Sequence, residues 1–454
     1  MLRKTTAVLV LALIAFAGFA EGTQDNPGAF AFNAGLNLGT DVIAAPDGTT
    51  DTWTKLAFQP DLAFGKIGVG IDLTVHFKLY PTNDQAIEFY PGDWVPDYQG
   101  NGKNFFDLYL PKILYVRYGL KGEDPFFVKL GSMNDLTLGN GFIMDDYSNM
   151  NFMPATRIFG LDIGLDGQLF NFPYVGLELI TGNLAKLDLV GGRIFARPLI
   201  GTEIPIVKNM QVGATVVADN VPDAYASTAY AAKPLAVYGM DVMVPILGGK
   251  TFPLAAFSEI AFEPNKSMGA MLGAGGRLLG FITYGAQLRL LQDGFIPSYF
   301  DTGYDIYRAA KFDYMQDSTG GDLKAGWYAT LGFSLFEDRI AFSTRLDGPF
   351  TAIPGVASSY QGDYPHAKAI LGLAEGLLGG FYFDARYEKY FIGKNAGFFP
   401  DLVDPTDAIV GLDINYKTGA SVLTLAYNAK WDPSLDSGNG KWVVTSSITA
   451  SMKF

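Results

Sequence analysis

Apolar and polar residues alternate with a two-residue period along much of the chain. Between residues 67 and 79, every odd position is bulky and apolar, and every even position is glycine or polar. This is the period of a β-strand whose two faces meet different surroundings. The alternation recurs at 56–64, 159–168, 282–290, 327–335, 381–388, 408–417, 423–431 and 442–454. The pattern therefore predicts a protein built almost wholly of β-strands.

The connections between these runs alternate in length. Short ones fall at 65–66, 121–124, 172–173, 248–250, 279–280, 337–339, 379–380 and 417–420. Long ones fall near 81–105, 140–157, 219–233, 292–323, 347–366, 392–406 and 432–440. Tight turns at one end and long loops at the other are typical of an antiparallel up-and-down β-barrel. We expect a single barrel of about 18–20 strands, with both chain ends on the short-turn side.

Composition supports one large all-β body rather than several domains. The chain has 454 residues, of which 14% are aromatic and only 17% charged, and its 54 glycines are spread evenly. It has no cysteine, so it forms no disulfide. After the N-terminal segment it has no apolar run of the roughly 18 residues that a membrane-spanning helix needs. In a bilayer, a closed barrel is the remaining solution, because every backbone polar group must be paired there.

The N-terminus has the features of a secretory signal. Arg3 and Lys4 precede an apolar run at 7–16, and Gly18-Phe19-Ala20 has the small–x–small form of a cleavage site. We therefore expect residues 1–20 to be a signal peptide and residues 21–454 to be the exported barrel.

The final run, 442–454, resembles the closing strand of bacterial outer-membrane β-barrel proteins, which ends in an aromatic residue that the insertion machinery recognises. Trp442, Met452 and Phe454 lie on one face of it and are the candidate insertion signal. The resemblance, to porin-like barrels without a specific subfamily, implies a single transmembrane barrel in the cell outer membrane with periplasmic N- and C-termini. It also implies the lipid bilayer and the insertion machinery as partners, and a possible homo-oligomer. Aromatic residues near strand ends, among them Trp53 and Trp431, are expected at the membrane interfaces.

The polar faces of the expected strands carry charges of both signs, and the net charge of the chain is −13. Unpaired charges cannot fill a dry core without a cost of about 2–4 kcal/mol each. A barrel of this size is also too wide for side chains to fill. These two facts favour a water-filled interior, and the alternative is an interior cross-linked by ion pairs and closed by loops.

Two long loops are candidates for shaping that interior. The segment 131–157 contains the acidic pair Asp145-Asp146. The porin resemblance implies that such a loop folds inward, with its carboxylates facing arginines, and the alternative is a solvated surface loop. The candidate lumen arginines are Arg193, Arg197, Arg277, Arg289, Arg345 and Arg386. The segment 292–324 mixes aromatic residues with carboxylates, which suits either sugar or partner binding, or a lid that packs its own side chains.

The expected function is a porin-like channel for passive diffusion of small hydrophilic solutes, with at most a mild preference for cations. We expect no enzymatic activity and no metal, because the chain has only two histidines, no cysteine and no recognisable catalytic or metal-binding spacing. We also expect no cofactor and no nucleic-acid partner. One alternative is a transporter of an apolar substrate, akin to fatty-acid channels, although residues 21–29 look too short for a plug. Another is a surface adhesin that uses the loops 81–105 and 292–323.

Overall fold

The computed structural model describes residues 30–44, 50–79, 87–100, 104–151, 157–224, 233–249, 251–317, 321–337, 339–351, 364–418, 421–432 and 441–453. The predicted signal peptide and Phe454 lie outside these residues. The strands are β1 (Phe30–Ala44), β2 (Thr50–Phe64), β3 (Ile67–Ile71), β4 (Leu73–Leu79), β5 (Ile87–Phe89), β6 (Ile113–Tyr118), β7 (Phe126–Gly131), β8 (Leu136–Leu138), β9 (Met144–Tyr147), β10 (Gly160–Asp166), β11 (Val175–Thr181), β12 (Leu189–Ala196), β13 (Gln211–Asp219), β14 (Leu235–Leu247), β15 (Leu254–Phe262), β16 (Met268–Leu278), β17 (Ile282–Gln292), β18 (Leu323–Leu335), β19 (Ile340–Pro349), β20 (His366–Leu378), β21 (Phe381–Lys389), β22 (Ala408–Thr418), β23 (Ser421–Asp432) and β24 (Lys441–Lys453). The helices are α2 (Phe105–Tyr109), α3 (Pro205–Lys208), α4 (Tyr304–Asp317) and α5 (Phe398–Val403).

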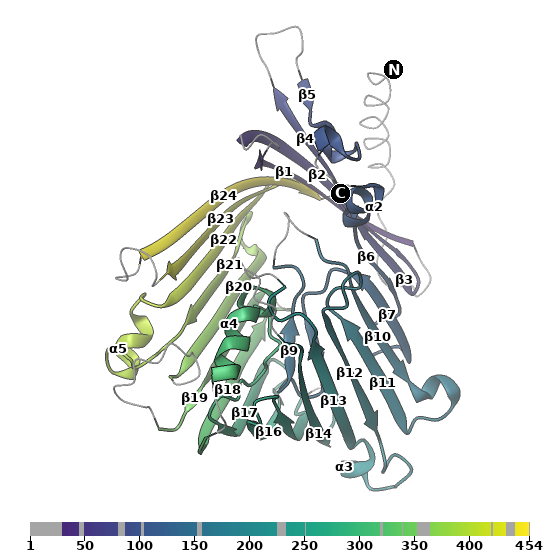
Figure 1. Cartoon of the computed structure of the whole chain (residues 1–454), viewed down its shortest axis with the longest axis vertical. Helices are drawn as coiled ribbons and strands as arrows, with labels where there is room; N and C mark the ends of the chain where they lie inside the picture. Colours follow the sequence, from purple (N-terminus) through teal and green to yellow (C-terminus); the bar gives the residue numbers. More distant parts are fainter. Residues whose placement is uncertain are drawn as a thin grey trace.

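The strands form a closed antiparallel ring. Each wall strand pairs with the next along the chain, and β1 pairs with β24 through Leu36 opposite Met452. The sheet contains 22 of the strands. Because β3 and β4 are consecutive halves of one wall segment, and β5 pairs only with β4 among the described residues, 20 segments make up the ring. Figure 1 shows these strands arranged around an interior that contains α4.

The connections follow the predicted alternation with exceptions. Most turns on the side of the two chain ends are short, such as the two residues between β2 and β3. The exception there is the 197–210 connection, which contains α3. On the opposite side, the connections 182–188 and 263–267 are short rather than long. The loop lengths thus vary more around the barrel than a strict alternation would allow.

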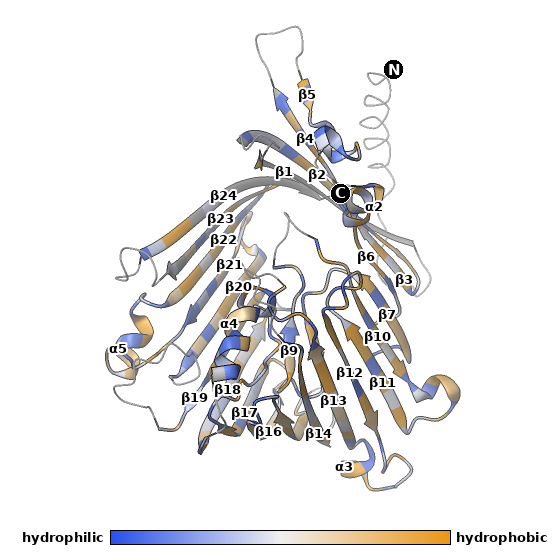
Figure 2. Cartoon of the chain, in the orientation of Figure 1, coloured by the Kyte–Doolittle hydropathy of each residue, from blue (hydrophilic) through white to orange (hydrophobic). Residues whose placement is uncertain are grey.

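Alternation along the strands divides the wall into two faces. Ile194, Met240 and Leu288 are exposed on the outer face, whereas their chain neighbours Arg193, Asp241 and Arg289 are buried inside. Figure 2 shows apolar residues predominating on the visible strands β11 to β14. An outward apolar face and an inward polar one is the arrangement of a barrel between lipid and water.

One proline in the wall marks a local interruption. Pro60 lies in β2 and is partnered on one side by Ala34 of β1. On the other side, pairing with β3 ends at Asp61–Gly70, and pairing with β4 resumes at Phe58–Leu73. A proline has no N–H to donate, so it tolerates this unpaired position.

Trp431 and Trp442, near the C-terminus, and Trp53 lie on opposite faces of the wall. Trp431 and Trp442 lie opposite each other on the outer face, with ring centroids 5.9 Å apart. Trp53 instead lies opposite Asp41 on the inner face and is buried against Tyr90. The prediction that Trp53 faces the membrane interface is therefore wrong, because its position in β2 shares a face with Lys55. None of the helices in the described part of the chain is long and apolar enough to cross a membrane.

Candidate functional site

Two loops fold into the barrel and pair with each other. We call residues 132–151, which contain β8 and β9, the acidic loop, and residues 293–317, which contain α4, the helical loop. Met144 and Phe300 form a parallel β-bridge between them. The amide of Asp145 donates to the carbonyl of Phe300 at 3.1 Å, and the amide of Phe300 donates to that of Ile143 at 3.1 Å. The inward interpretation of the acidic loop, rather than the solvated one, is the one that the structure shows.

The two loops and the adjoining wall enclose an apolar core. The acidic loop contributes residues such as Phe142, and the helical loop contributes Phe295, whose ring stacks on that of Phe142 at 5.3 Å. The wall contributes Val217, Val237 and Met271. This part of the interior is dry, and the helical loop packs its own side chains as predicted for a lid.

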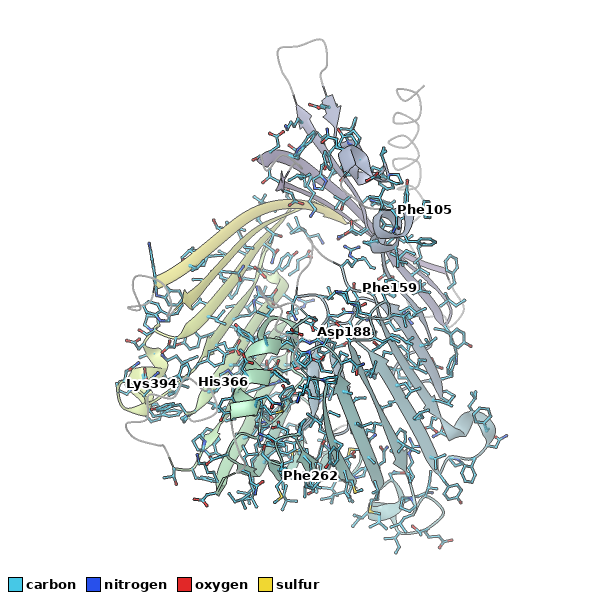
Figure 3. The ribbon with its side chains drawn as sticks, in the orientation of Figure 1. Phe105, Phe159, Asp188, Phe262, His366 and Lys394 are labelled. Atoms are coloured by element: carbon cyan, nitrogen blue, oxygen red, sulfur yellow. The ribbon has the colours of Figure 1, made fainter. Side chains whose placement is uncertain are left out.

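The helical loop is anchored to the wall by a buried arginine. Arg308 of α4 pairs with Asp188 at 3.0 Å and with Asp219 at the end of β13. Figure 3 shows Asp188 beside α4. In the same helix, Asp305 accepts a hydrogen bond from the hydroxyl of Tyr147 at 3.3 Å. Burial raises the pKa of Asp305 to about 7.

The acidic pair meets an arginine of the opposite wall. Nη1 of Arg345 lies 3.4 Å from Asp145, and Nη2 lies 2.7 Å from Asp146. Asp146 has a φ of 52°, a left-handed conformation that aspartate adopts more readily than most residues. Burial raises the pKa of Asp145 above its usual range, and the adjacent Asp146 adds to the effect.

Most of the other predicted lumen arginines have partners of their own. Arg193 binds Asp241 at 2.6 Å and Arg197 binds Asp166 at 2.6 Å. Arg386 binds Asp413 at 3.0 Å. The predicted contact of the acidic pair with Arg193 or Arg197 is therefore not formed, because carboxylates on nearby strands bind these arginines.

The two remaining arginines lie on neighbouring strands. Arg277 is exposed near the short turn after β16, far along its strand from the acidic loop, and so does not contact the acidic pair either. Arg289 of β17 is buried, and its guanidinium lies 4.3 Å from the ring of Tyr328 and 5.9 Å from that of Phe142. Arg289 thus approaches the acidic loop without forming an ion pair with it among the described residues.

The two sides of the interior differ in their access to water. On the side of β12 to β14, the side chains of Arg193 and Asp241 are 6% and 1% exposed. On the side of β19 to β22, the side chains of Arg345 and Arg386 are 41% and 49% exposed. The loops therefore cover the charged side chains on the side of β12 to β14 and leave Arg345 and Arg386 accessible on the side of β19 to β22.

Both histidines are held between carboxylates on the inner face. His366 lies 3.1 Å from Asp347 and 3.1 Å from Glu388, and His76 lies 2.8 Å from Asp93 and 3.1 Å from Asp41. Within the described residues, no group of three or more acidic or histidine side chains is arranged to hold a metal ion.

Two features of the interior were not predicted, although the sequence contains a signal for each. Tyr304, Arg308, Phe312 and Met315 are all buried and share one face of α4, a helical spacing within what was expected to be an irregular loop. In β13 and β14, Val217 and Val237 place apolar residues on the inner face as well. An inner face with such residues indicates that something other than water covers it.

Several solved structures are similar to this chain over most of its length. OccAB2 of Acinetobacter baumannii shares 12% identity over 96% of this chain and 99% of that one, with a TM-score of 0.36. Wzi, an outer membrane protein involved in group 1 capsule assembly in Escherichia coli, shares 13% identity over 93% and 84%, with a TM-score of 0.36. A porin of Rh. blastica shares 8% identity over 94% and 100%, with a TM-score of 0.29. At these values the matches carry no residue-by-residue correspondence.

No family model matches the chain, and no curated protein matches it in sequence. The assignment of the architecture therefore rests on the pairing of the strands and on the two faces of the wall. The closed ring of 20 segments, apolar outside and charged inside, is the architecture of an outer-membrane β-barrel protein, and the predicted fold class is confirmed.

Proposed function

We propose that the protein is an outer-membrane channel through which small hydrophilic solutes diffuse passively. The observation that carries this proposal is the accessible charge on the inner face of β19 to β22. Arg345, Arg386 and Lys417 keep 41%, 49% and 38% of their side chains exposed within a closed barrel. Such charges need water around them, because their burial in a dry interior would be costly.

The acidic loop supplies the selective element of this channel. Its tip holds Asp145 and Asp146 against Arg345, so solutes pass a point where both signs of charge are close together. Selectivity then depends on the charges that line the passage and on its width. With carboxylates outnumbering the arginine at this point, a mild preference for cations follows.

Conductance in a planar bilayer tests the proposal. The purified, folded protein should give ohmic steps in potassium chloride, and protein unfolded by heat before addition should give none. A folded barrel that leaves the membrane silent would overturn the channel. If that silent protein binds a fatty acid in a saturable way, it is instead a transporter of an apolar substrate.

Export depends on the N-terminal segment in this proposal. We infer that residues 1–20 are removed on secretion, from the charge and apolar run that precede Ala20. The mass of the protein recovered from the outer membrane tests this cleavage site.

A further inference from the structure

Arg289 is a buried guanidinium without a carboxylate partner. Among the described residues three arginines are buried: Arg193 is 5% exposed, Arg289 8% and Arg308 1%. The first pairs with Asp241 and the third with Asp188 and Asp219. In the part of the chain that the structure describes, Arg289 forms no ion pair and donates one hydrogen bond, from Nε to Oε1 of Gln287 at 3.0 Å.

Two aromatic rings lie close to the guanidinium of Arg289, but neither satisfies its hydrogen-bond donors. The guanidinium carbon lies 4.3 Å from the centre of the Tyr328 ring and 5.9 Å from that of Phe142. Aromatic faces attract a cation, but they do not replace hydrogen-bond acceptors for its N–H groups. An arginine presents five such donors, and among the described residues the two Nη groups of Arg289 donate no hydrogen bond, so they can bind a ligand.

Arg289 also lines a cavity. This cavity measures about 70 Å³. A separate cavity of about 440 Å³ lies near the short turns, beside Arg277 and Phe281. The smaller cavity, beside Arg289, holds water or a group of a few heavy atoms. Its other lining cation, Lys324, is paired with Asp293 at 2.5 Å. Two carboxylates also line the cavity: Asp293 pairs with Lys324, and Asp347 lies 3.1 Å from His366. Arg289 is therefore the lining cation that has no ion pair among the described residues.

We propose that Arg289 forms a binding subsite for the carboxylate group of a solute inside the barrel. A carboxylate is small enough for the cavity and matches the paired N–H donors of a guanidinium, which bind it through two parallel hydrogen bonds. This inference rests on the proposed channel function, because the solute must reach the interior. The subsite would bind an anion within a chain whose net charge is −13.

Binding of acetate tests the subsite directly. Carbon-13 acetate is titrated into the folded, detergent-solubilised protein, and its line broadening is followed. Arg289→Gln should weaken acetate binding about tenfold or more, because it removes a charge-assisted pair. Arg289→Lys keeps the charge but loses the forked geometry, so it should weaken binding less.

Arg117→Gln is the matched control. This arginine lies on β6 and donates to the carbonyl of Gly119, so its replacement removes one positive charge away from the cavity. Acetate binding should be unchanged in this variant. Equal acetate affinity in the wild type, Arg289→Gln and Arg289→Lys would overturn the subsite. If Arg289→Gln does not fold, the comparison of Arg289→Lys with the wild type decides the question.

Conductance of the same proteins separates this inference from the channel proposal. If the protein conducts but binds acetate independently of Arg289, the channel proposal stands and the subsite proposal is overturned. If the protein binds acetate through Arg289 but never conducts, the subsite proposal stands and the channel proposal is overturned.

Discussion

Arg345 lies against two adjacent carboxylates and still has a partly exposed side chain. Its contacts with Asp145 and Asp146 join positions 200 and 199 residues apart in the chain. An accessible ion pair of this kind adds little stability, since exposed pairs contribute about 0–1 kcal/mol. Its importance lies in the electrostatic field that a passing ion meets.

Replacing Arg345 by glutamine should therefore increase the preference for cations. The two carboxylates lose their counter-charge, and we expect the ratio of potassium to chloride permeability to rise about threefold. Reversal potentials in a potassium chloride gradient measure this ratio. Arg339→Gln, at the exposed short turn before β19, makes the same change in charge outside the passage and should leave the ratio near that of the wild type. An unchanged ratio in Arg345→Gln would place the ion pathway elsewhere.

At the scale of elements, α4 shows how a loop becomes part of a barrel interior. One face of the helix places Tyr304, Phe312 and Met315 in the apolar core, and Arg308 pairs with the wall. A buried ion pair of this kind is costly to break, because the remaining charge stays in a dry environment. The helical loop is thus a fixed part of the interior.

The attachment of α4 should depend on pH through Asp305. Its pKa is about 7 in the folded protein and ordinarily 3.8, so the folded state holds a proton that the detached loop releases. The contribution of Asp305 to the stability of the attached helix should be greatest at low pH, decline between about pH 4 and pH 7, and level off above that range. Hydrogen exchange of residues 304–317, corrected for the intrinsic pH effect, measures it.

Asp305→Asn should remove most of this dependence, because the amide does not titrate. Asp313→Asn changes an exposed residue of the same helix and should retain the pH profile of the wild type. A wild-type exchange profile that stays flat from pH 4 to pH 8 would contradict the assignment to Asp305.

At the scale of the whole molecule, closure of the ring determines which face of each strand meets lipid. Leu425 near the middle of β23 points outward, and Ala426 points inward, opposite Asp413. Adjacent residues on one strand therefore have opposite surroundings.

Arginine at these two positions should have opposite consequences. Leu425→Arg should lower the free energy of unfolding in lipid vesicles by about 2–4 kcal/mol, the cost of a cation near the bilayer midplane. Ala426→Arg faces the interior beside a carboxylate and should change stability little. Urea titration of the refolded proteins compares them, and equal losses in both variants would contradict the assignment of faces.

The sequence predicted the wall better than the interior. The alternation in β17, β18 and β22 identified their outer faces, because each depends only on neighbours two positions apart. The charged inner face was predicted in the same way. The partners of those charges were not, and Arg193 and Arg197 bind nearby carboxylates instead of the acidic loop.

The sequence by itself determined an all-β chain with two unlike faces and a number of strands close to that observed, because these properties arise from local periodicity. Only the tertiary structure decided that the acidic and helical loops fold inward, that Arg345 meets Asp145 and Asp146, and that Arg289 has no carboxylate partner among the described residues. These contacts join segments that are far apart in the chain. They come together only when the ring closes and brings opposite walls within reach of the same loop.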